Sequence, residues 1–258
     1  MSLISIENVN KTYQSVDRSS ITALKDINLE IEEGEFVCLV GPSGCGKSTM
    51  LHLVAGFDYP TQGKIYLNQE VVTQPGPDRI IIFQEPALWP WLNVRHNIEF
   101  GLTISGATPT ARNQIVNDLL KMTNLERFAN SRIHELSGGM KQKIALARAL
   151  APNPKILLMD EPFASLDAQT RRMMQQELLT IWTLTRKTIL FVTHNVNEAI
   201  TMADRIVVLT KRPGQIKKII PVLLPRPRVR TNYDFNTIRQ AVYQDLEIEV
   251  TQAYASNS

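Results

Sequence analysis

The chain contains a glycine-rich segment, GPSGCGKST at Gly41–Thr49, whose residue types and spacing suit phosphate binding. It follows the pattern G-x-x-x-x-G-K-[ST], in which glycines let successive backbone N–H groups turn toward phosphate oxygens. Lys47 would reach the β- and γ-phosphates, and the Ser48 hydroxyl would bind Mg²⁺. The sequence therefore predicts a nucleotide-binding loop made of Gly41, Pro42, Ser43, Gly44, Cys45, Gly46, Lys47, Ser48 and Thr49.

A second glycine-rich turn, LSGGM at Leu136–Met140, precedes a stretch rich in Ala, Leu, Arg and Lys. Ser137 is expected to cap a helix, and Gly138 and Gly139 allow close approach to the backbone. An ordinary helix start explains Ser137 but not the two glycines, whereas an anion at the helix N-terminus explains both. Because one chain holds each element once, we expect the anion to be a γ-phosphate on a neighbouring chain.

Polar side chains follow two apolar, β-branched segments. Lys155–Met159 leads into Asp160 and Glu161, and Thr188–Thr193 leads into His194. The C-terminal ends of buried parallel strands are where α/β domains place their chemistry. Two adjacent carboxylates repel each other unless a cation or a reaction uses them, whereas a lone histidine is more often structural.

Cys45 lies inside the phosphate loop, and Cys38 is the other of the two cysteines. We expect no disulfide between them and a reducing cytoplasm as the compartment. Cys45 is either a small filler residue or a thiol made reactive by the helix N-terminus and shielded by bound nucleotide. The second alternative predicts that a thiol alkylator abolishes ATP hydrolysis and that saturating ATP protects.

Alternating and continuous apolar patterns predict the elements that position these residues. Strands are expected at 3–13, 21–31, Glu35–Val40, Arg79–Gln84, Lys155–Met159 and Thr188–Thr193, and helices at Ser48–Gly56, Ala111–Met122 and Met140–Leu150. Phe235, Ile238, Val242 and Leu246 recur at helical spacing after a proline-punctuated basic linker, Leu224–Arg230. The predicted domains are a core of 1–85 and 150–215, a helical insertion of 86–149, and a C-terminal linker and amphipathic helix in 216–258.

Composition narrows the class of protein. The 258 residues carry a formal net charge of +3, too small to indicate nucleic acid or a lipid surface as partner. No apolar run approaches the roughly 18 residues that a membrane-spanning helix needs. The N-terminal residues MSLISIENVNKTY lack the pattern of a signal peptide.

Together, GPSGCGKST, LSGGM, ILLMDEP and His194 resemble the ATP-binding subunit of an ABC transporter, from Ile4 to about Leu224. The resemblance implies an α/β fold: a P-loop NTPase (RecA-like) sheet core with an N-terminal antiparallel β part and an inserted helical subdomain. It also implies an ATPase with ATP and Mg²⁺ as cofactors. LSGGM and the pairing of DEP with His194 argue against a P-loop kinase, which is one alternative.

The resemblance assigns roles to individual residues. Asp160 would hold Mg²⁺ through water, Glu161 would be the general base, and Gln84 would reach Mg²⁺ and the attacking water. His194 would contact the γ-phosphate and orient that water, and Tyr13 would stack on adenine. Contacts to nucleotide on the partner chain would come from Ser137, Gly138, Gly139, Met140 and Asp167, the last in the SLD loop.

The resemblance also implies partners. Trp89, Trp91 and Leu92, in EPALWPWLNVRHNIEF, would help line a groove for a coupling helix of a transmembrane permease. The second ATPase subunit would be a copy of this chain or a longer relative, and a periplasmic or lipid-anchored solute-binding protein would act indirectly. No nucleic acid is expected as partner, and the chain would sit on the cytoplasmic face of the inner membrane.

A finer resemblance points to importers of nitrate, sulfonates, taurine and bicarbonate. Three segments carry this finer resemblance: LSGGM with Met in place of Gln, LWPWLNV, and LPRPR after the ATPase core. We expect this chain to be without the fused solute-binding domain of some members of that branch. The transported solute stays open, as does the alternative of a soluble ABC-type ATPase that drives assembly without a permease.

Overall fold

The computed structural model describes residues 2–14 and 20–255. They form two compact units, residues 1–76 with 188–258, and residues 77–187. The sequence predicts domain boundaries at other positions, after residues 85, 149 and 215, and those domains stay a prediction. In the described part of the chain, no helix combines the length and the apolar character needed to cross a membrane.

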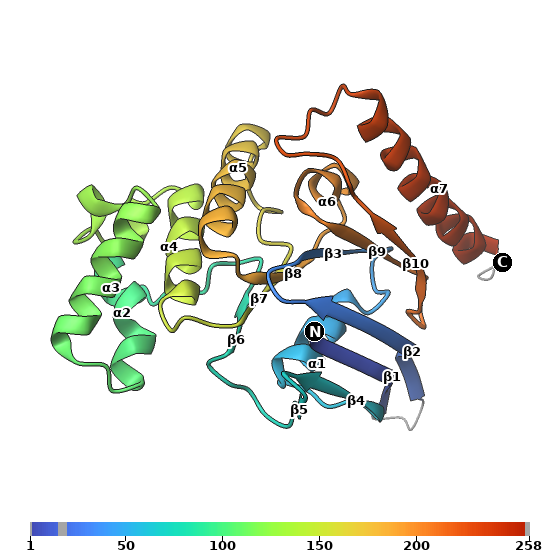
Figure 1. The fold of residues 1–258 in the computed structure, drawn as a ribbon, viewed down its shortest axis with the longest axis horizontal. Coiled ribbons are helices and arrows are strands. Elements are labelled where there is room, and N and C mark those ends of the chain that lie inside the picture. The colour runs from blue at the N-terminus through green and yellow to red at the C-terminus, as the bar shows by residue number, and fades with distance from the viewer. Residues whose placement is uncertain (1, 15–19, 256–258) are drawn as a thin grey trace. The chain divides into compact units, whose positions relative to one another are not determined.

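The first unit contains an antiparallel sheet near the N-terminus (Figure 1). Its order is β2-β1-β4-β5, with bounds β1 Ser2–Gln14, β2 Ser20–Glu32, β4 Gln62–Leu67 and β5 Glu70–Val71. In β1 and β2 buried apolar residues such as Ile4, Ile27 and Ile31 recur between exposed ones. This alternation buries one face of the sheet, and it confirms the strands predicted at 3–13 and 21–31.

The second sheet of this unit carries the phosphate loop. Its strands are β3 Phe36–Val40, β8 Thr188–Val192, β9 Arg205–Leu209 and β10 Ile216–Pro221. β3 lies between β8 and β9 and runs parallel to both, and β10 pairs antiparallel with β9. All residues of β3 and β8 are buried, as expected for parallel strands covered on both faces, and the rings of Phe36 and Phe191 lie 5.9 Å apart. Residues 216–221, placed in the predicted linker, form β10.

Three helices complete the first unit: α1 Lys47–Ala55, α6 Val196–Met202 and α7 Tyr233–Ala255. The predicted amphipathic helix at the C-terminus is confirmed, with Phe235 and Val242 fully buried where α7 packs on α6. The turn between β9 and β10 also holds the two sheets together. Gly214 donates its N–H to the Ala23 carbonyl at 2.8 Å and accepts from the Lys25 N–H at 2.9 Å.

The second unit contains two parallel strands and a group of helices (Figure 1). The strands are β6 Arg79–Ile82 and β7 Ile156–Asp160. The helices are α2 Val94–Ile104, α3 Pro109–Met122, α4 Gly138–Leu150 and α5 Ala168–Thr185, with short 3₁₀ turns at Glu126–Phe128 and Ile133–Glu135. α2, α3 and α4 pack on one another, and α4 packs on α5 and β6. The prediction of helices at 111–122 and 140–150 is confirmed.

Candidate functional site

The phosphate loop connects β3 to α1, which is the strand–loop–helix context that the motif requires. Gly46, just before α1, has φ 103°. A Cβ on Gly46 would lie 2.6 Å from Cδ2 of Leu24 and 3.0 Å from the Ala23 carbonyl oxygen. Both the backbone conformation and the close approach to β2 therefore require glycine at this position.

Lys47 is held inside the loop that it follows. Its side chain is 7% exposed, and Nζ donates to the carbonyl oxygens of Gly41 at 2.8 Å and Pro42 at 2.9 Å. Ser48 and Gly44 are exposed, so the outer side of the loop is open to a ligand. A buried ammonium aimed at the interior of a glycine-rich loop can exchange carbonyl partners for phosphate oxygens.

The surroundings of Cys45 favour the interpretation of this residue as a small filler. The side chain is fully buried, and the Cβ of any residue replacing Gly41 would meet its sulfur at 2.7 Å. Burial raises the pKa of the Cys45 thiol and outweighs the opposing effect of the Lys47 charge. Desolvation opposes formation of a thiolate here, so these observations favour the filler interpretation, and the reactivity of Cys45 stays a prediction. Cys38 and Cys45 are both free cysteines.

Tyr13 lies on β1 in a polar cluster with Lys11 and Asp58. Its hydroxyl donates to Oδ2 of Asp58 at 2.8 Å, and Nζ of Lys11 lies 2.5 Å from Oδ1 of Asp58 and 4.8 Å from the centre of the Tyr13 ring. Burial and the hydrogen bond to Asp58 raise the pKa of Tyr13, while Thr49 at the end of the phosphate loop works in the opposite direction. The ring is 40% exposed and its phenol is neutral, so it presents a surface on which a base could stack.

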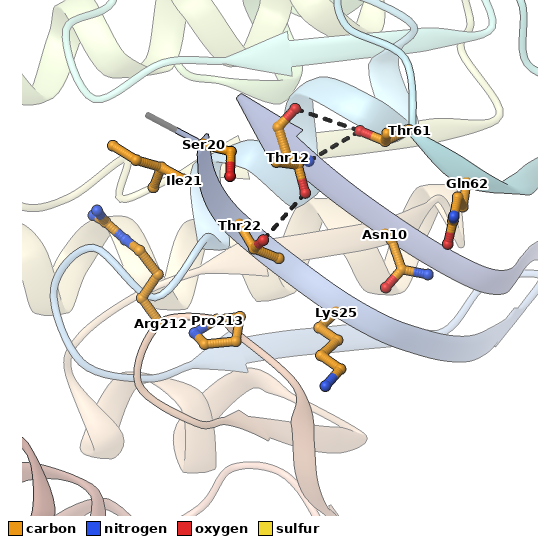
Figure 2. A pocket seen from close by; sticks show the side chains of 10 residues that line it. All are labelled: Asn10, Thr12, Ser20, Ile21, Thr22, Lys25, Thr61, Gln62, Arg212 and Pro213. Atoms are coloured by element: carbon orange, nitrogen blue, oxygen red, sulfur yellow. Dashed lines mark hydrogen bonds between the residues drawn. The ribbon is translucent and has the colours of Figure 1, made fainter. Parts of the chain in front are cut away.

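A polar pocket of about 610 Å³ opens beside the N-terminal sheet (Figure 2). Residues from β1, β2 and β4 and from the β9–β10 turn line it, and several satisfy one another: Thr12 bonds to Thr22 at 3.2 Å and to Thr61. Arg212, from the turn, donates Nε to the Gly44 carbonyl oxygen at 3.1 Å. Sequence reasoning missed Arg212, since nothing in the motif indicates that this distant turn contacts the phosphate loop.

His194 follows β8 and is exposed, in a short connection to α6. The residues on either side of it are fixed. Thr193 donates its hydroxyl to the buried Glu198 at 2.6 Å and accepts from the Asn195 N–H at 3.0 Å. The imidazole therefore projects from a segment whose backbone is tied down on both sides.

In the second unit, Asp160 is the last residue of β7, and Glu161 follows with φ 46°. This left-handed conformation costs a residue with a side chain roughly 1–2 kcal/mol, and such strain is concentrated at functional sites. Gln84 is exposed and lies two residues beyond β6, which ends at Ile82 instead of continuing to residue 84 as predicted.

The second glycine-rich turn begins α4 with Ser137 as its N-cap. The Ser137 side chain accepts from the Met140 N–H at 3.3 Å, and Ser137 and Gly138 are exposed. Gly139 is buried, and a Cβ there would lie 2.8 Å from Cγ2 of Thr170. The first glycine therefore leaves the helix N-terminus open, and the second permits packing against α5.

Asp167 caps α5. Its carboxylate accepts from the N–H groups of Gln169 and Thr170, each at 3.0 Å. The hydrogen bonds from Thr170 are the largest cause of the lowered pKa of Asp167. The residue is an ionised N-cap in this chain, and any contact to a second chain would come in addition to that.

The tryptophan-rich segment leads into α2. The Trp89 ring lies 5.3 Å from that of Trp91 and 5.2 Å from that of Phe100. Trp89 and Phe100 line an apolar groove of about 360 Å³, together with residues of β6 and α4 that include Ile81, Ala145 and Arg148. Trp91, at 65% exposed, and Leu92 are not among the lining residues that the structure describes.

No three His, Cys, Asp or Glu side chains of the described chain gather as a metal-binding group. The residues that the resemblance assigns to Mg²⁺ are a different set of ligands, Ser48, Gln84 and Asp160. They offer a hydroxyl, an amide oxygen and a carboxylate, the hard oxygen donors that Mg²⁺ prefers, and Ser48 and Gln84 are exposed. The chemistry of this donor set fits the ion.

Comparison with known proteins agrees with this fold. The family model described as ABC transporter matches residues 24–164, and the chain belongs to that family. It is an ABC-type ATPase with an α/β cassette fold. A solved dimeric ATP-binding cassette, bound to ADP and Pi in a post-hydrolysis state, is similar with a TM-score of 0.74 and 35% identity, covering 86% of this chain and 100% of the other.

Three curated relatives match almost the full length of the chain. An uncharacterised ABC transporter ATP-binding protein of Methanocaldococcus jannaschii is 47% identical, covering 97% of this chain and 93% of its own. The nitrate import ATP-binding protein NrtD of Synechocystis sp. is 42% identical, covering 98% and 99%. The taurine import ATP-binding protein TauB of Ruegeria pomeroyi is 43% identical, covering 93% and 89%.

Proposed function

We propose that the chain energises import of a small anion through a membrane permease by binding and hydrolysing ATP. The observation that carries the proposal is the exposed, glycine-rich N-terminus of α4, together with a phosphate loop of which Lys47 is part. Relatives named for nitrate and taurine import support the class of cargo. The chain would act at the cytoplasmic face of the membrane.

In the proposed mechanism, two ATP molecules are bound head to tail between two chains. The phosphate loop and Lys47 of one chain hold the β- and γ-phosphates, and Ser137 and Gly138 of the other offer N–H groups to the γ-phosphate. Tyr13 stacks on adenine. Closure and reopening of the pair would then shift the permease between two conformations.

Hydrolysis is assigned to residues that follow the strands. Glu161 accepts a proton from the attacking water, and His194 orients that water against the γ-phosphate. Mg²⁺, held by Ser48, Asp160 and Gln84, would neutralise charge on the phosphates. The left-handed backbone of Glu161 supports its role, since such backbone strain is concentrated at functional sites.

The apolar groove beside Trp89 is the proposed contact with the permease. Its lining is aromatic and aliphatic, with Arg148 donating to the carbonyl oxygens of Ala87 at 2.9 Å and Pro86 at 3.0 Å and so fixing the wall of the groove. A short helix from a membrane subunit would insert an apolar side chain there. Trp91 and Leu92 would lie at the rim.

The test of the ATPase role is Glu161→Gln. This variant should bind ATP normally, lose hydrolysis, and accumulate as an ATP-bound dimer in size-exclusion chromatography. Loss of ATP binding would contradict the assigned role. Asp118→Asn, on the exposed surface of α3, is the matched control and should hydrolyse ATP like the parent chain.

The test of the transporter role is a pull-down of tagged chain from detergent-solubilised membranes. A multispanning permease should co-purify, and a double substitution of Trp89 and Phe100 by alanine should release it while leaving ATP binding intact. The companion solute-binding protein can then be screened with nitrate, bicarbonate, sulfonates and taurine. Recovery of soluble partners alone would refute the proposal.

A further inference from the structure

The segment Leu224–Arg230, predicted as a simple linker, is bound to the end of α6 by Arg228. The guanidinium group donates from Nη1 to Ile200 at 2.6 Å and to Ala203 at 2.5 Å. It also donates from Nη2 to Val222 at 2.8 Å and from Nε to Leu224 at 3.0 Å. All four acceptors are backbone carbonyl oxygens. A helix leaves its last carbonyls without partners, and here one side chain supplies the donors.

Arg226 adds a second connection at the same helix end. It donates to the Met202 carbonyl oxygen and pairs with Oδ1 of Asp204 at 2.8 Å. The other carboxylate oxygen of Asp204 accepts from the Phe36 N–H at 3.0 Å, at the start of β3. The end of α6 is thus tied to the strand that leads into the phosphate loop.

The beginning of α6 is bonded to the residues on either side of His194. The Asn195 side chain accepts from the N–H groups of Asn197 at 3.0 Å and Glu198 at 3.3 Å, and Thr193 bonds to Glu198. His194 lies between these anchors. A helix of only seven residues is too short to be stable by itself, so its position depends on such contacts.

The chemistry at Arg228 is specific to arginine. Burial and the neighbouring Arg226 charge lower the pKa of Arg228 to about 10, so the cation is held at a cost to its solvation. A guanidinium presents five N–H donors in a fixed plane, whereas a lysine ammonium is a compact group that cannot reach the same four carbonyls together. A flexible linker has no need for such an arrangement.

We propose that Arg228, assisted by Arg226, is a positioning residue for ATP hydrolysis: it fixes α6 and thereby sets the position of His194. The inference rests on the role proposed for His194 above. It gives the LPRPR segment an effect on the reaction, although the segment itself touches neither nucleotide nor the reacting atoms.

The experiment uses full-length chain carrying Arg228→Gln, Arg228→Lys or His194→Ala, and each Arg228 change combined with His194→Ala. ATP hydrolysis gives kcat and KM, nucleotide binding is measured separately, and thermal unfolding reports on the fold. Both Arg228 variants should lower kcat about ten- to a hundredfold with unchanged KM and ATP affinity, as misplacement of a catalytic group does. In the His194→Ala background the same changes should lower kcat no further.

Arg239→Gln is the matched control, since Arg239 lies on α7 and makes no hydrogen bond to α6 in the described chain; it should hydrolyse ATP like the parent. A normal kcat in His194→Ala would refute the role of His194, and with it the basis of the inference. The positioning role alone would be refuted if His194→Ala lowers kcat but the Arg228 variants either keep the parental kcat or lower kcat further in the His194→Ala background. If both Arg228 variants lose ATP affinity and fail to fold, the segment serves only the stability of the fold, and the positioning role is also refuted.

Discussion

Replacing Gly46 with alanine tests whether the phosphate loop depends on its close packing against β2. Two costs follow from the structure. A φ of 103° is unfavourable for alanine by roughly 1–2 kcal/mol. The new Cβ would also lie 2.6 Å from Leu24, and overpacking of this kind costs about 1–3 kcal/mol. The expected loss of stability is therefore about 2–5 kcal/mol, a large part of the roughly 5–15 kcal/mol that stabilises a typical domain.

The assay is equilibrium unfolding in guanidinium chloride without nucleotide, followed by titration with ATP. Gly106→Ala is the matched control, because Gly106 has φ 76° but nothing within 4 Å of its Cβ position. It should cost only the conformational strain of about 1–2 kcal/mol. Gly101→Ala, inside α2 and also in open space, should instead stabilise the protein by about 0.8–1.0 kcal/mol.

Comparison of the variants decides the outcome. If Gly46→Ala lowers the free energy of unfolding by no more than Gly106→Ala does, the Leu24 side chain moves aside without a measurable cost. The steric reasoning would then be wrong. If Gly46→Ala is destabilised as expected but binds ATP with parental affinity, the glycine serves folding only. The expected result is a loss of both stability and ATP affinity, because Lys47 follows directly and shares the loop geometry.

Three further predictions concern buried or charged groups. Asn97 is fully buried, and its side chain donates to three backbone carbonyl oxygens. Asn97→Ala should therefore lower the free energy of unfolding by about 2–4 kcal/mol. The control is Asn117→Ala at an exposed position, which should change the free energy of unfolding by less than about 0.5 kcal/mol. Burial would raise the pKa of Asp58, but hydrogen bonds led by Lys11 lower it. The stability that Asp58 contributes is therefore complete above its ordinary pKa of 3.8, and it is lost as the pH falls through the lower pKa of the folded state. The difference in free energy of unfolding between the parent chain and Asp58→Asn should shrink over that pH range. A difference that stays constant with pH would contradict this prediction. Cys45 should react with a thiol alkylator only slowly with or without ATP, as followed by mass spectrometry, and rapid labelling that ATP prevents would restore the reactive-thiol interpretation.

Much of the fold was accessible from the sequence because its signals are local. The phosphate loop follows from glycines at fixed spacing, and the strands around it follow from continuous apolar runs such as Phe36–Val40. Helices α2, α5 and α6 and strands β4, β5, β9 and β10 were not assigned. β5 has only two residues, both exposed, and α6 has only seven, too few to show a helical period. The turn between β9 and β10 contains the charged residues Lys211 and Arg212.

The functional residues were accessible to different degrees. Motif positions such as Lys47 could be named from the chain, but their partners could not. The contact of Arg212 with Gly44 and that of Arg228 with the end of α6 join residues far apart in sequence, and only folding brings them together. For Cys45 the sequence left two interpretations open. Its position near a helix start suggested either a filler or a reactive thiol, and burial raises the pKa of the thiol, which favours the filler.

The turn that contains Gly214 has a consequence for engineering and for natural variation in length. Surface hairpin turns usually accept insertions and reporter tags. Here a single added Cβ on Gly214 would fall 2.0 Å from the Cys45 carbonyl oxygen, and both backbone groups of the glycine are bonded to β2. Insertions between residues 211 and 215 should therefore be rejected, whereas the turn at Asn68 and Gln69, between β4 and β5, is the better place for a tag.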